Sequence, residues 1–422
     1  MTIKEQILEM GANALSASRA LSCLSTEDKD AILLAMADSL VKSSADVLAA
    51  NKLDISAAEE NGLTCAMVDR LRLDDKRLGA IAEGIRKVAA LPDPVGEVIS
   101  NWQRPNGMDI TQLRVPIGVI GIIFESRPNV TSDAAVLCLK AGNATILRGG
   151  SEAIHSNRAI AAALQSGGEG AGLPPKSVQL IPFTERESVQ HLAEMDQYLD
   201  LIIPRGGAGL IEKVVSLARM PVIKHYDGIC HVFVDSEADM DMAVSITVDS
   251  KTQKPGVCNA LETLLVHKDI AGEFIPRSFS ELKARGVELR CDEQSLAIAG
   301  GDVKAAEDAD WRTEYLDLIL SVRVVEDLAG AISHITEFGS QHSDCIVTQN
   351  QPRAERFLQE IDSATVFWNA STRFSDGEEF GFGAEIGIST DKLHARGPMA
   401  LRELTSYKYL IRGEGQTKGE PK

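Results

Sequence analysis

Gly118-Val-Ile-Gly-Ile-Ile-Phe124 is an uninterrupted apolar run, and it gives way at once to the polar segment Glu125-Ser-Arg-Pro-Asn129. A short apolar run that ends in turn residues is typical of a strand buried on both faces of a parallel sheet. Similar runs recur after it, separated by helical segments; they are Ala144-Thr-Ile-Leu147, Val178-Gln-Leu-Ile181, Leu199-Asp-Leu-Ile-Ile203 and His231-Val-Phe-Val234. This alternation predicts βαβ units.

The same alternation continues in the second half of the chain. The apolar runs there are Glu262 to Val266, Leu318 to Val325, Cys345 to Thr348 and Thr365 to Trp368. A chain of 422 residues is too long for one hydrophobic core. We therefore expect two α/β domains, each built on a parallel sheet, with a boundary near Ser250.

Two other patterns precede this region. The N-terminal part has helical spacing, for example in Ala31 to Ala37, where Ser25 or Thr26 can cap the helix. Asn106-Gly107 lies between two extended segments, Ile99 to Gln103 and Asp109 to Val115, which is a good signal for a β-hairpin.

Composition excludes several classes of protein. The formal net charge of −18 argues against a nucleic-acid binder, which needs a positive surface. The N-terminus lacks the pattern of a signal peptide, and the longest apolar stretch, Val115 to Phe124, is too short to span a membrane. The 7 cysteines are scattered and show no CxxC spacing, which is typical of a reducing cytoplasm without disulfides or a cysteine metal site. We expect a cytoplasmic protein without a metal.

One cysteine lies in a segment suited to a reactive thiol. Cys258 follows the tight turn Pro255-Gly256, and Lys251 and Lys254 precede it. Nearby cations favour the thiolate, which is the nucleophilic form of cysteine. The alternative is that Cys258 is a small buried hydrophobe, as free cysteines often are. These residues alone leave both interpretations open.

Polar residues follow the strand at Gly118 to Phe124, at the edge where open parallel sheets bind ligands. The Asn129 amide is suited to donate to a developing oxyanion, and the Arg127 guanidinium is suited to bind an anion. The alternative is an ordinary helix start with Asn129 or Thr131 as its N-cap.

Further segments are weaker indications. The glycine turns Leu147 to Glu152 and Ile203 to Gly209 each join a strand to a helix and suit a phosphate or a ribose, but neither is a GxGxxG. Ser371-Thr372-Arg373 can grip a carboxylate or a phosphate, and Glu385 can accept hydrogen bonds from a ribose, although such loops are often only solvated. His225, Cys230 and His231 match no zinc spacing.

Together these segments resemble the gamma-glutamyl phosphate reductases (glutamate-5-semialdehyde dehydrogenases), a branch of the aldehyde dehydrogenase superfamily. The resemblance runs nearly from end to end, with the motifs in the same order. These motifs are Leu91-Pro-Asp-Pro-Val-Gly96, Val115-Pro-Ile-Gly-Val-Ile-Gly121, Phe124-Glu-Ser-Arg-Pro-Asn129, Pro255-Gly-Val-Cys-Asn-Ala260, Asn369-Ala-Ser-Thr-Arg-Phe374, Gly383-Ala-Glu-Ile-Gly-Ile-Ser-Thr390 and His394-Ala-Arg-Gly-Pro-Met399.

The resemblance implies NADPH-dependent reduction of L-glutamate 5-phosphate to L-glutamate 5-semialdehyde and phosphate, the second step of proline biosynthesis. It implies an aldehyde-dehydrogenase-like fold of two Rossmann-like α/β domains plus a β-hairpin oligomerisation arm, in a dimer or a tetramer. Glutamate 5-kinase, which makes the substrate, is a further partner that it suggests. The expected NADP-binding domain comprises 1–97, 117–250 and 387–402, the catalytic domain 251–386, the arm 98–116 and 403–412, and a loose tail 413–422.

By the same resemblance, Cys258 attacks the acyl phosphate while Asn129 and the Cys258 N–H hold the oxyanion. Phosphate leaves, and hydride from NADPH reduces the remaining thioester to the aldehyde. The implied substrate-binding residues are Ser126, Arg127, Ser371, Thr372 and Arg373. The implied cofactor-binding residues are Arg148, Gly149, Ser151, Arg205, Gly206, Gly207 and Glu385.

Two positions refine this assignment. Hydrolytic aldehyde dehydrogenases activate water with a glutamate, and His225 is in the matching place, so the thioester is not exposed to such a base. Ser151 stands where NAD-preferring relatives have an acid near the adenosine ribose, and Arg148 is available for a 2′-phosphate, which favours NADP.

Two alternatives remain at this point. A CoA-acylating aldehyde dehydrogenase shares the thiol, the fold and the missing glutamate, but it does not need Arg127 or the grip at Ser371 to Arg373. A non-catalytic protein with the same fold is expected to have lost Cys258 or Asn129, and both are present.

Overall fold

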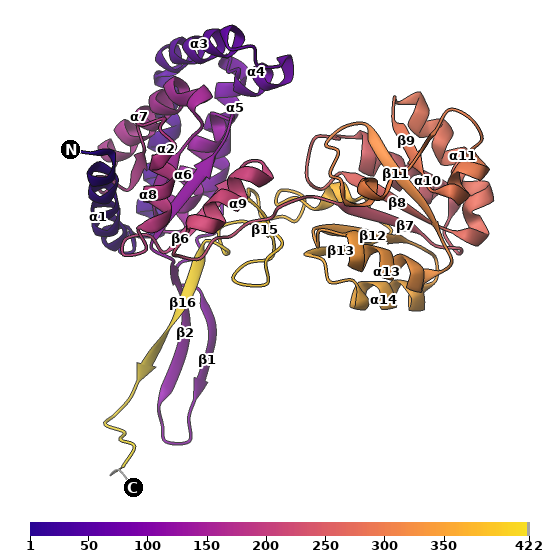
Figure 1. Cartoon of the computed structure of the whole chain (residues 1–422). Coiled ribbons are helices and arrows are strands. Elements are labelled where there is room, and N and C mark those ends of the chain that lie inside the picture. The colour runs from indigo at the N-terminus through magenta and orange to yellow at the C-terminus, as the bar shows by residue number, and fades with distance from the viewer. Residues whose placement is uncertain (420–422) are drawn as a thin grey trace. The chain divides into compact units, whose positions relative to one another are not determined.

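The computed structural model describes residues 1–419 and divides the chain into two compact units (Figure 1). Unit 1 comprises Met1–Lys224, Phe382–Gly387 and Met399–Lys422, and unit 2 comprises His225–Gly381 and Ile388–Pro398. The last part of the predicted tail, 420–422, lies outside the described residues. In the described part of the chain, no helix is long and apolar enough to cross a membrane.

Unit 1 begins with helices, as the sequence predicts. Thr2 and Ser25 form capping boxes with Glu5 and Asp28, which confirms the predicted cap at Ser25. Helix α2 (Thr26–Lys42) packs against α5 (Asp75–Ala90) and against α7 (Ile154–Gly170). The N-terminal helices are α1 (Ile3–Leu21), α2 (Thr26–Lys42), α3 (Ser44–Glu60), α4 (Cys65–Leu71) and α5 (Asp75–Ala90).

The main sheet of unit 1 is parallel, with the strand order β5-β4-β3-β6. Its strands are β3 (Val119–Phe124), β4 (Ala144–Arg148), β5 (Val178–Leu180) and β6 (Leu201–Arg205). The helices between and after them are α6 (Asn129–Lys140), η1 (Ser151–Ala153), α7 (Ile154–Gly170), α8 (Glu187–Glu194) and α9 (Ala208–Leu217). Every residue of β3 is buried, which explains why its sequence shows no polar alternation.

A second sheet of unit 1 forms an arm. The predicted hairpin is present as the antiparallel pair β1 (Val98–Gln103) and β2 (Asp109–Pro116), and β16 (Thr405–Arg412) pairs with the other edge of β2. Figure 1 shows this three-stranded sheet projecting from the helices of unit 1. It carries exposed large apolar side chains, namely Val98, Ile99, Trp102, Tyr407, Tyr409 and Ile411.

Unit 2 is built on a parallel sheet with the strand order β10-β9-β11-β8-β7-β12-β13. The strands are β7 (Cys230–Val234), β8 (Leu261–His267), β9 (Glu288–Cys291), β10 (Lys304–Ala305), β11 (Ile319–Val325), β12 (Ser343–Val347) and β13 (Thr365–Trp368). The helices are α10 (Met240–Thr252), α11 (Lys268–Ala284), α12 (Glu293–Ala299), η2 (Asp308–Arg312), α13 (Leu328–Phe338), α14 (Gln351–Glu360) and η3 (Thr372–Phe374). Two further short strands, β14 (Gly387–Ser389) and β15 (Gly397–Met399), pair with each other.

Helices cover both faces of this sheet, with α10 and α11 on one side and α13 and α14 on the other (Figure 1). Successive side chains of β7 therefore enter different layers. Val232 and Val234 belong to the apolar cluster that contains Phe274 of α11, whereas Phe233 belongs to the cluster that contains Phe357 of α14.

The boundary between the units differs from the expected one near Ser250, because it falls between Lys224 and His225. The apolar pattern of β7 identifies a strand but does not tell which sheet it joins. In the structure β7 pairs with β8 and with β12, so β7 and the helix α10 belong to the unit that carries the thiol. The segment 388–398, expected in the cofactor domain, also lies in unit 2, whereas 382–386, expected in the catalytic domain, lies in unit 1.

Candidate active site

A cavity of about 1210 Å³ opens in unit 1 beside the segments that follow β3, β4 and β5. This is the edge at which open parallel sheets bind ligands. The predicted cofactor residues Arg148 and Ser151 line it, and so does the predicted substrate residue Ser126. The cavity also has two cations that the sequence analysis did not single out, Arg186 and Lys213. Its position and its lining suit a nucleotide.

The turns after β3 and β4 are held together by one carboxylate. Ser126, whose φ of 38° is left-handed, donates from both its N–H and its hydroxyl to Glu152 Oε1, at 2.6 and 2.7 Å. Burial opposes the ionisation of Glu152, but the hydrogen bonds from Ser126 and the charge of Arg148 outweigh it and lower its pKa. The Ser126 hydroxyl is therefore already engaged, and Glu152 fixes the wall of the cavity.

Arg148 is buried at the end of β4, with 9% of its surface exposed. Its two terminal nitrogens donate to the carbonyls of Gly149 and Thr184, each at 3.1 Å. Burial lowers the pKa of Arg148, and the like charge of Arg186 lowers it further while Glu152 opposes them. Arg148 and Arg186 thus bring two positive charges to a cavity that is also lined by carboxylates, namely Asp54, Glu125, Glu152 and Glu187.

Gly149 follows Arg148 and lies close to the side chains of Asn157 and Phe124. A Cβ at Gly149 would be 2.1 Å from Asn157 Nδ2 and 3.1 Å from the Phe124 ring, so only glycine lets β4 approach α7 here. The predicted role of Gly149 in cofactor binding remains a proposal, because the structure gives this residue a packing role.

Asn129 is the first residue of α6, and Pro128 is the residue at the N-cap position. The alternative in which Asn129 or Thr131 caps the helix is therefore wrong. Asn129 Nδ2 donates to Asp133 Oδ2 at 2.8 Å. Burial raises the pKa of Asp133 to about 6, although the hydrogen bond from Asn129 and the charge of Arg205 act against it. A primary amide has two N–H groups, so Asp133 orients Asn129 and leaves one donor for a ligand.

The remaining turn predicted in unit 1 follows β6. The Gly207 N–H donates to Glu125 Oε2 at 3.0 Å, and a Cβ at Gly206 would be 2.5 Å from the same oxygen. The Arg205 guanidinium lies against Gly387, in the segment that carries the half-buried Glu385. These predicted cofactor residues therefore lie near the carboxyl end of β6, and they do not line the cavity beside Arg148. The predicted Arg127 follows β3 and is exposed.

Unit 2 carries Cys258 in the loop between α10 and β8, where its side chain is only partly buried. This exposure argues against the interpretation of Cys258 as a core hydrophobe. The Cys258 carbonyl accepts a hydrogen bond from Cys230 Sγ at 3.2 Å. Within residues 1–419, the Cys258 N–H donates to no other group. An N–H without a partner beside a nucleophilic sulfur is what an oxyanion donor requires.

The predicted anion-binding residues Ser371, Thr372 and Arg373 lie directly against this loop. Thr372 is buried and donates from Oγ1 to the Asn259 carbonyl at 2.8 Å, while the buried Ser371 contacts Ser250 through their hydroxyls at 3.0 Å. Arg373 is half-buried, and its Nε donates to Gln253 Oε1 at 2.9 Å. Ser371 and Thr372 therefore hold the loop of the nucleophile, and Arg373 is the member of the grip with surface open to a ligand.

The two lysines that precede the thiol lie in different environments. Lys251 is fully buried and forms an ion pair with the fully buried Glu262, at 2.7 Å between Nζ and Oε2. Lys254 is exposed. The sequence places Lys251 near Cys258 in the chain but cannot show that a carboxylate neutralises it.

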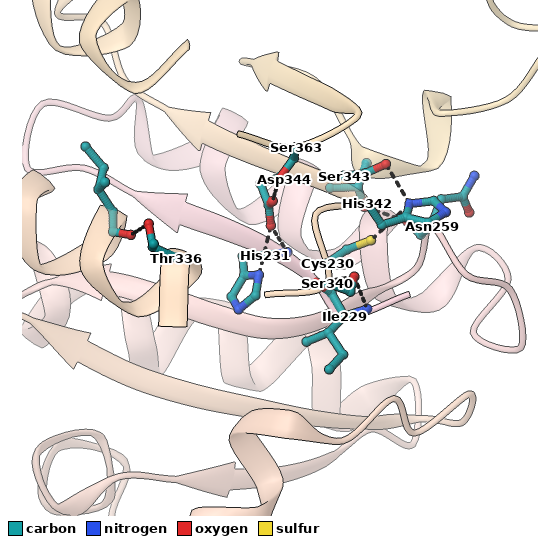
Figure 2. A network of polar contacts seen from close by, with 12 residues as sticks. Ile229, Cys230, His231, Asn259, Thr336, Ser340, His342, Ser343, Asp344 and Ser363 are labelled. Carbon is teal, nitrogen blue, oxygen red and sulfur yellow. Dashed lines mark hydrogen bonds and ion pairs between the residues drawn. The ribbon is translucent and has the colours of Figure 1, made fainter. Parts of the chain in front are cut away.

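The segment 225–230 forms the other wall of the thiol loop. A Cβ at Gly228 would be 2.1 Å from the Cys258 carbonyl oxygen, so the two backbones touch. His225 has its Nδ1 3.0 Å from the Ile388 carbonyl and its ring in edge contact with His342. Figure 2 shows Cys230 directed toward His342, with Sγ and Nδ1 3.7 Å apart.

Figure 2 also shows a second polar network on β7 and β12. His231 Nδ1 lies 2.8 Å from Asp344 Oδ1, and Ser363 donates to the other oxygen of Asp344. Both His231 and Asp344 are fully buried. Among the residues that the structure describes, no group of three or more histidine, cysteine, aspartate or glutamate side chains could hold a metal ion.

The comparisons with known proteins agree with this fold. The chain belongs to the aldehyde dehydrogenase family, whose model matches residues 2–296. Its similarity is strongest to one branch of that family, the gamma-glutamyl phosphate reductases. A protein of that name from Geotalea daltonii is 54% identical over 99% of this chain and 99% of its own length. Another, from Geobacter metallireducens, is 53% identical over 99% of this chain and 100% of its own length.

Solved structures show the same relationship. The crystal structure of gamma-glutamyl phosphate reductase from Thermotoga maritima is 46% identical and covers 98% of this chain and 100% of its own, with a TM-score of 0.96. An acetylating aldehyde dehydrogenase from Geobacillus thermoglucosidasius is only 18% identical, with a TM-score of 0.70, so it shares the fold alone. The predicted family, fold class and oxidoreductase activity are confirmed.

Sequence reasoning missed several residues that the structure brings to these sites, namely Asp133, Glu152, Arg186, Lys213, Gly228 and Glu262. One signal was present for Asp133, because Asn129 and Asp133 are one helical turn apart and such residues share a face. For the others no local signal exists, since each acts on a segment distant in the sequence.

Proposed function

We propose that this protein uses NADPH to reduce L-glutamate 5-phosphate to L-glutamate 5-semialdehyde and phosphate through a thioester on Cys258. The observation that carries the proposal is the partly exposed Cys258 with an N–H that has no partner among the described residues. The names of its relatives, gamma-glutamyl phosphate reductases at up to 54% identity, support the substrate.

The Cys258 sulfur is the nucleophile in this reaction. The Cys258 thiolate attacks the acyl carbon, a C–S bond forms, and the C–O bond to the phosphate breaks as phosphate leaves with the electron pair. When bound, the nicotinamide supplies the hydride that reduces the thioester carbon. Collapse of the resulting thiohemiacetal breaks the C–S bond, releases the aldehyde and regenerates the thiolate.

The oxygen of the acyl group carries negative charge in both halves of this sequence. The Cys258 N–H and the second N–H of Asn129 are the proposed donors to it. His225 offers no carboxylate of the kind that activates water in hydrolytic aldehyde dehydrogenases. This difference supports phosphate rather than water as the group that exchanges with the thioester.

The cavity of unit 1 is the proposed cofactor site. Aldehyde dehydrogenases use NAD or NADP, and this cavity combines a helix start at Ser151 with the cations Arg148, Arg186 and Lys213. Ser151 adds no negative charge near a 2′-phosphate. Because Arg148 is buried whereas Arg186 and Lys213 are exposed, we assign the direct contact to Arg186 and Lys213, with Arg148 holding the Thr184 segment in place.

A cofactor titration tests this assignment. The double variant Arg186→Ala/Lys213→Ala is expected to bind NADPH about tenfold to a hundredfold more weakly while its affinity for NADH stays within about twofold. Lys42→Ala, an exposed cation on α2 outside the cavity, is the matched control. An equal loss of affinity for NADPH and for NADH would show that Arg186 and Lys213 do not bind the 2′-phosphate.

Arg127 and Arg373 are the proposed grips for the anionic ends of the substrate. Both are surface-accessible in their own units, and Arg373 is tied to the thiol loop through Gln253. A CoA-acylating enzyme, the alternative from the same superfamily, has no use for such a pair. The solved acylating relatives are similar to this chain only in fold.

The reverse reaction tests the proposal as a whole. With glutamate 5-semialdehyde, NADP and phosphate, the parent protein should form NADPH, and omission of phosphate should stop it. Cys258→Ala should abolish this activity, and Asn129→Ala should lower turnover about a hundredfold to a thousandfold. Activity without phosphate, or with CoA in its place, would overturn the assignment.

We also propose self-association through the arm. Exposed apolar side chains on a projecting sheet mark a protein contact, and the edge contact of Trp102 and Tyr409 lies on it. The free state of all seven cysteines suits the proposed place in the cytoplasm. Association with glutamate 5-kinase stays an expectation from the resemblance.

A further inference from the structure

A buried ion pair closes the base of the thiol loop. Lys251 lies in the last turn of α10, Glu262 lies in β8, and the loop that carries Cys258 joins these two elements. The Lys251 ammonium and the Glu262 carboxylate are 2.7 Å apart, and neither side chain is exposed at all. The pair therefore fastens both ends of the loop to each other.

Such a pair is not explained by stability alone. Taking two charges out of water costs several kcal/mol per ion, and apolar residues of similar volume usually serve a core as well or better. The strand itself accommodates apolar side chains, since Leu261 and Leu264 on either side of Glu262 in the sequence are fully buried. A charged pair at this place therefore calls for a role that apolar side chains do not fulfil.

The pair also ties a third segment to the loop. Glu262 Oε1 accepts a hydrogen bond from the Leu316 N–H at 3.2 Å, and the Lys251 ammonium lies 5.9 Å from the centre of the Tyr315 ring. The Leu316 carbonyl is 3.6 Å from the position of a Cβ on Gly256, in the turn just before the nucleophile. Directional bonds from Glu262 thus set where this segment lies against the turn before Cys258.

The electrostatics of the pair agree with this arrangement. Burial raises the pKa of Glu262 to about 7, and Lys251 opposes the shift. Burial also lowers the pKa of Lys251, while Glu262 opposes that shift. Each charge is therefore stabilised by its partner, and removal of either one leaves a buried charge without compensation.

We propose that Lys251 and Glu262 are positioning residues for the nucleophile. They hold the Cys258 loop against the segment at Leu316 so that the sulfur and its neighbouring N–H keep the geometry needed for acyl transfer. The proposal rests on the proposed function, because it assumes that Cys258 is the nucleophile. Lys251 and Glu262 act on catalysis through the loop and do not touch the substrate.

The test uses a double variant that separates position from stability. Lys251→Met/Glu262→Leu removes both charges and keeps the volume, so its stability to urea should stay close to that of the parent. Its kcat in the phosphate-dependent reverse reaction should fall about tenfold to a hundredfold, because small misplacements of reacting groups cost that much. The KM for NADP, which binds in the cavity of unit 1, should change less than about twofold.

A second readout does not depend on turnover. The rate of Cys258 alkylation by iodoacetamide, followed by peptide mass spectrometry, should rise about threefold or more in the double variant as the loop loosens. The exposed Cys23 and Cys65 are internal references whose rates should not change. The exposed pair Lys268 and Glu326, replaced in the same way, is the matched control and should leave kcat and alkylation as they are.

The outcomes are distinct. A stable double variant with the kcat and the Cys258 alkylation rate of the parent would overturn the positioning role. Activity in Cys258→Ala would instead overturn the proposed function. If the Lys251→Met/Glu262→Leu variant does not fold, Lys251→Met/Glu262→Gln also leaves no buried charge and keeps the Oε1 that accepts from the Leu316 N–H, and it is expected to lower kcat about threefold to tenfold. An unchanged kcat in Lys251→Met/Glu262→Gln would then refute the proposal.

Discussion

Gly228→Ala is expected to impair catalysis although residue 228 carries no reactive group. The new Cβ would lie 2.1 Å from the Cys258 carbonyl oxygen and 2.5 Å from the Cys258 Cα, whereas ordinary van der Waals contact begins at 3.4 Å. Both obstructing atoms belong to the backbone, so no rotation of a side chain can relieve the overlap. The two segments must separate by roughly 1 Å, since protein interiors leave no room to absorb it.

This displacement acts directly on the nucleophile. A misplacement on the order of 1 Å at a reacting group costs about a hundredfold in rate, so kcat in the reverse reaction should fall about a hundredfold. Crowding of this kind also destabilises a protein by about 1–3 kcal/mol, which urea unfolding followed by circular dichroism should detect. The protein should therefore fold, and its loss of activity should exceed any loss of folded protein.

Gly272→Ala is the matched control in the same unit. Gly272 lies within α11, and a Cβ added there has no atom within 4 Å. Alanine favours a helix over glycine by about 0.8–1 kcal/mol, so this variant should be slightly more stable and fully active. A kcat for Gly228→Ala within about threefold of the parent would refute the argument, because it would mean that the contact does not fix the Cys258 backbone.

Two further predictions concern pH and assembly. Burial, followed by the charges of His231 and Arg323, lowers the pKa of His334 to about 2. The unfolded chain therefore binds a proton below pH 6.5 that the folded protein does not bind, and folding stability falls by up to roughly 1.4 kcal/mol per pH unit below 6.5. His334→Asn should reduce the dependence of the free energy of unfolding on pH, measured by urea unfolding between pH 6.5 and 4.5. The same change at the exposed His155 should not reduce it. An equal pH dependence in the two variants would contradict the low pKa of His334. Ile411 lies on the arm and is 61% exposed, and Ile411→Asp should reduce the mass of the oligomer in analytical ultracentrifugation. Leu53 lies on α3 and is 57% exposed, and Leu53→Asp should leave the mass unchanged. An unchanged mass for both variants would exclude the arm as the oligomer contact.

The sequence predicts the elements of this fold well because most of them are long and strongly patterned. The run at Gly118 to Phe124 becomes the fully buried β3, and Asn106-Gly107 becomes a hairpin turn. The strand Glu288–Cys291 escaped prediction, since it is short and its residues alternate between half-buried and buried. The assignment of β7 to a sheet also escaped, because pairing depends on strands far away in the chain.

The candidate site shows the same limit more sharply. Cys258 and Asn129 can be named as candidates from the sequence because their own residue types carry the proposed chemistry. Gly228 is not identifiable, because its importance lies in an approach to the backbone at Cys258. The sequence shows Lys251 as a cation near the thiol, but only the fold buries it together with its partner Glu262.

The pairing of β16 with β2 has a consequence for biosynthesis. Thr405 lies opposite Pro116 in this pair, so the last strand of the arm leaves the ribosome only after all of unit 2 has been made. Until then one edge of β2 has no neighbour, and an open edge is prone to pair with other chains. A nascent chain of this protein therefore exposes an unpaired edge of β2 until β16, which follows unit 2 in the sequence, has been translated.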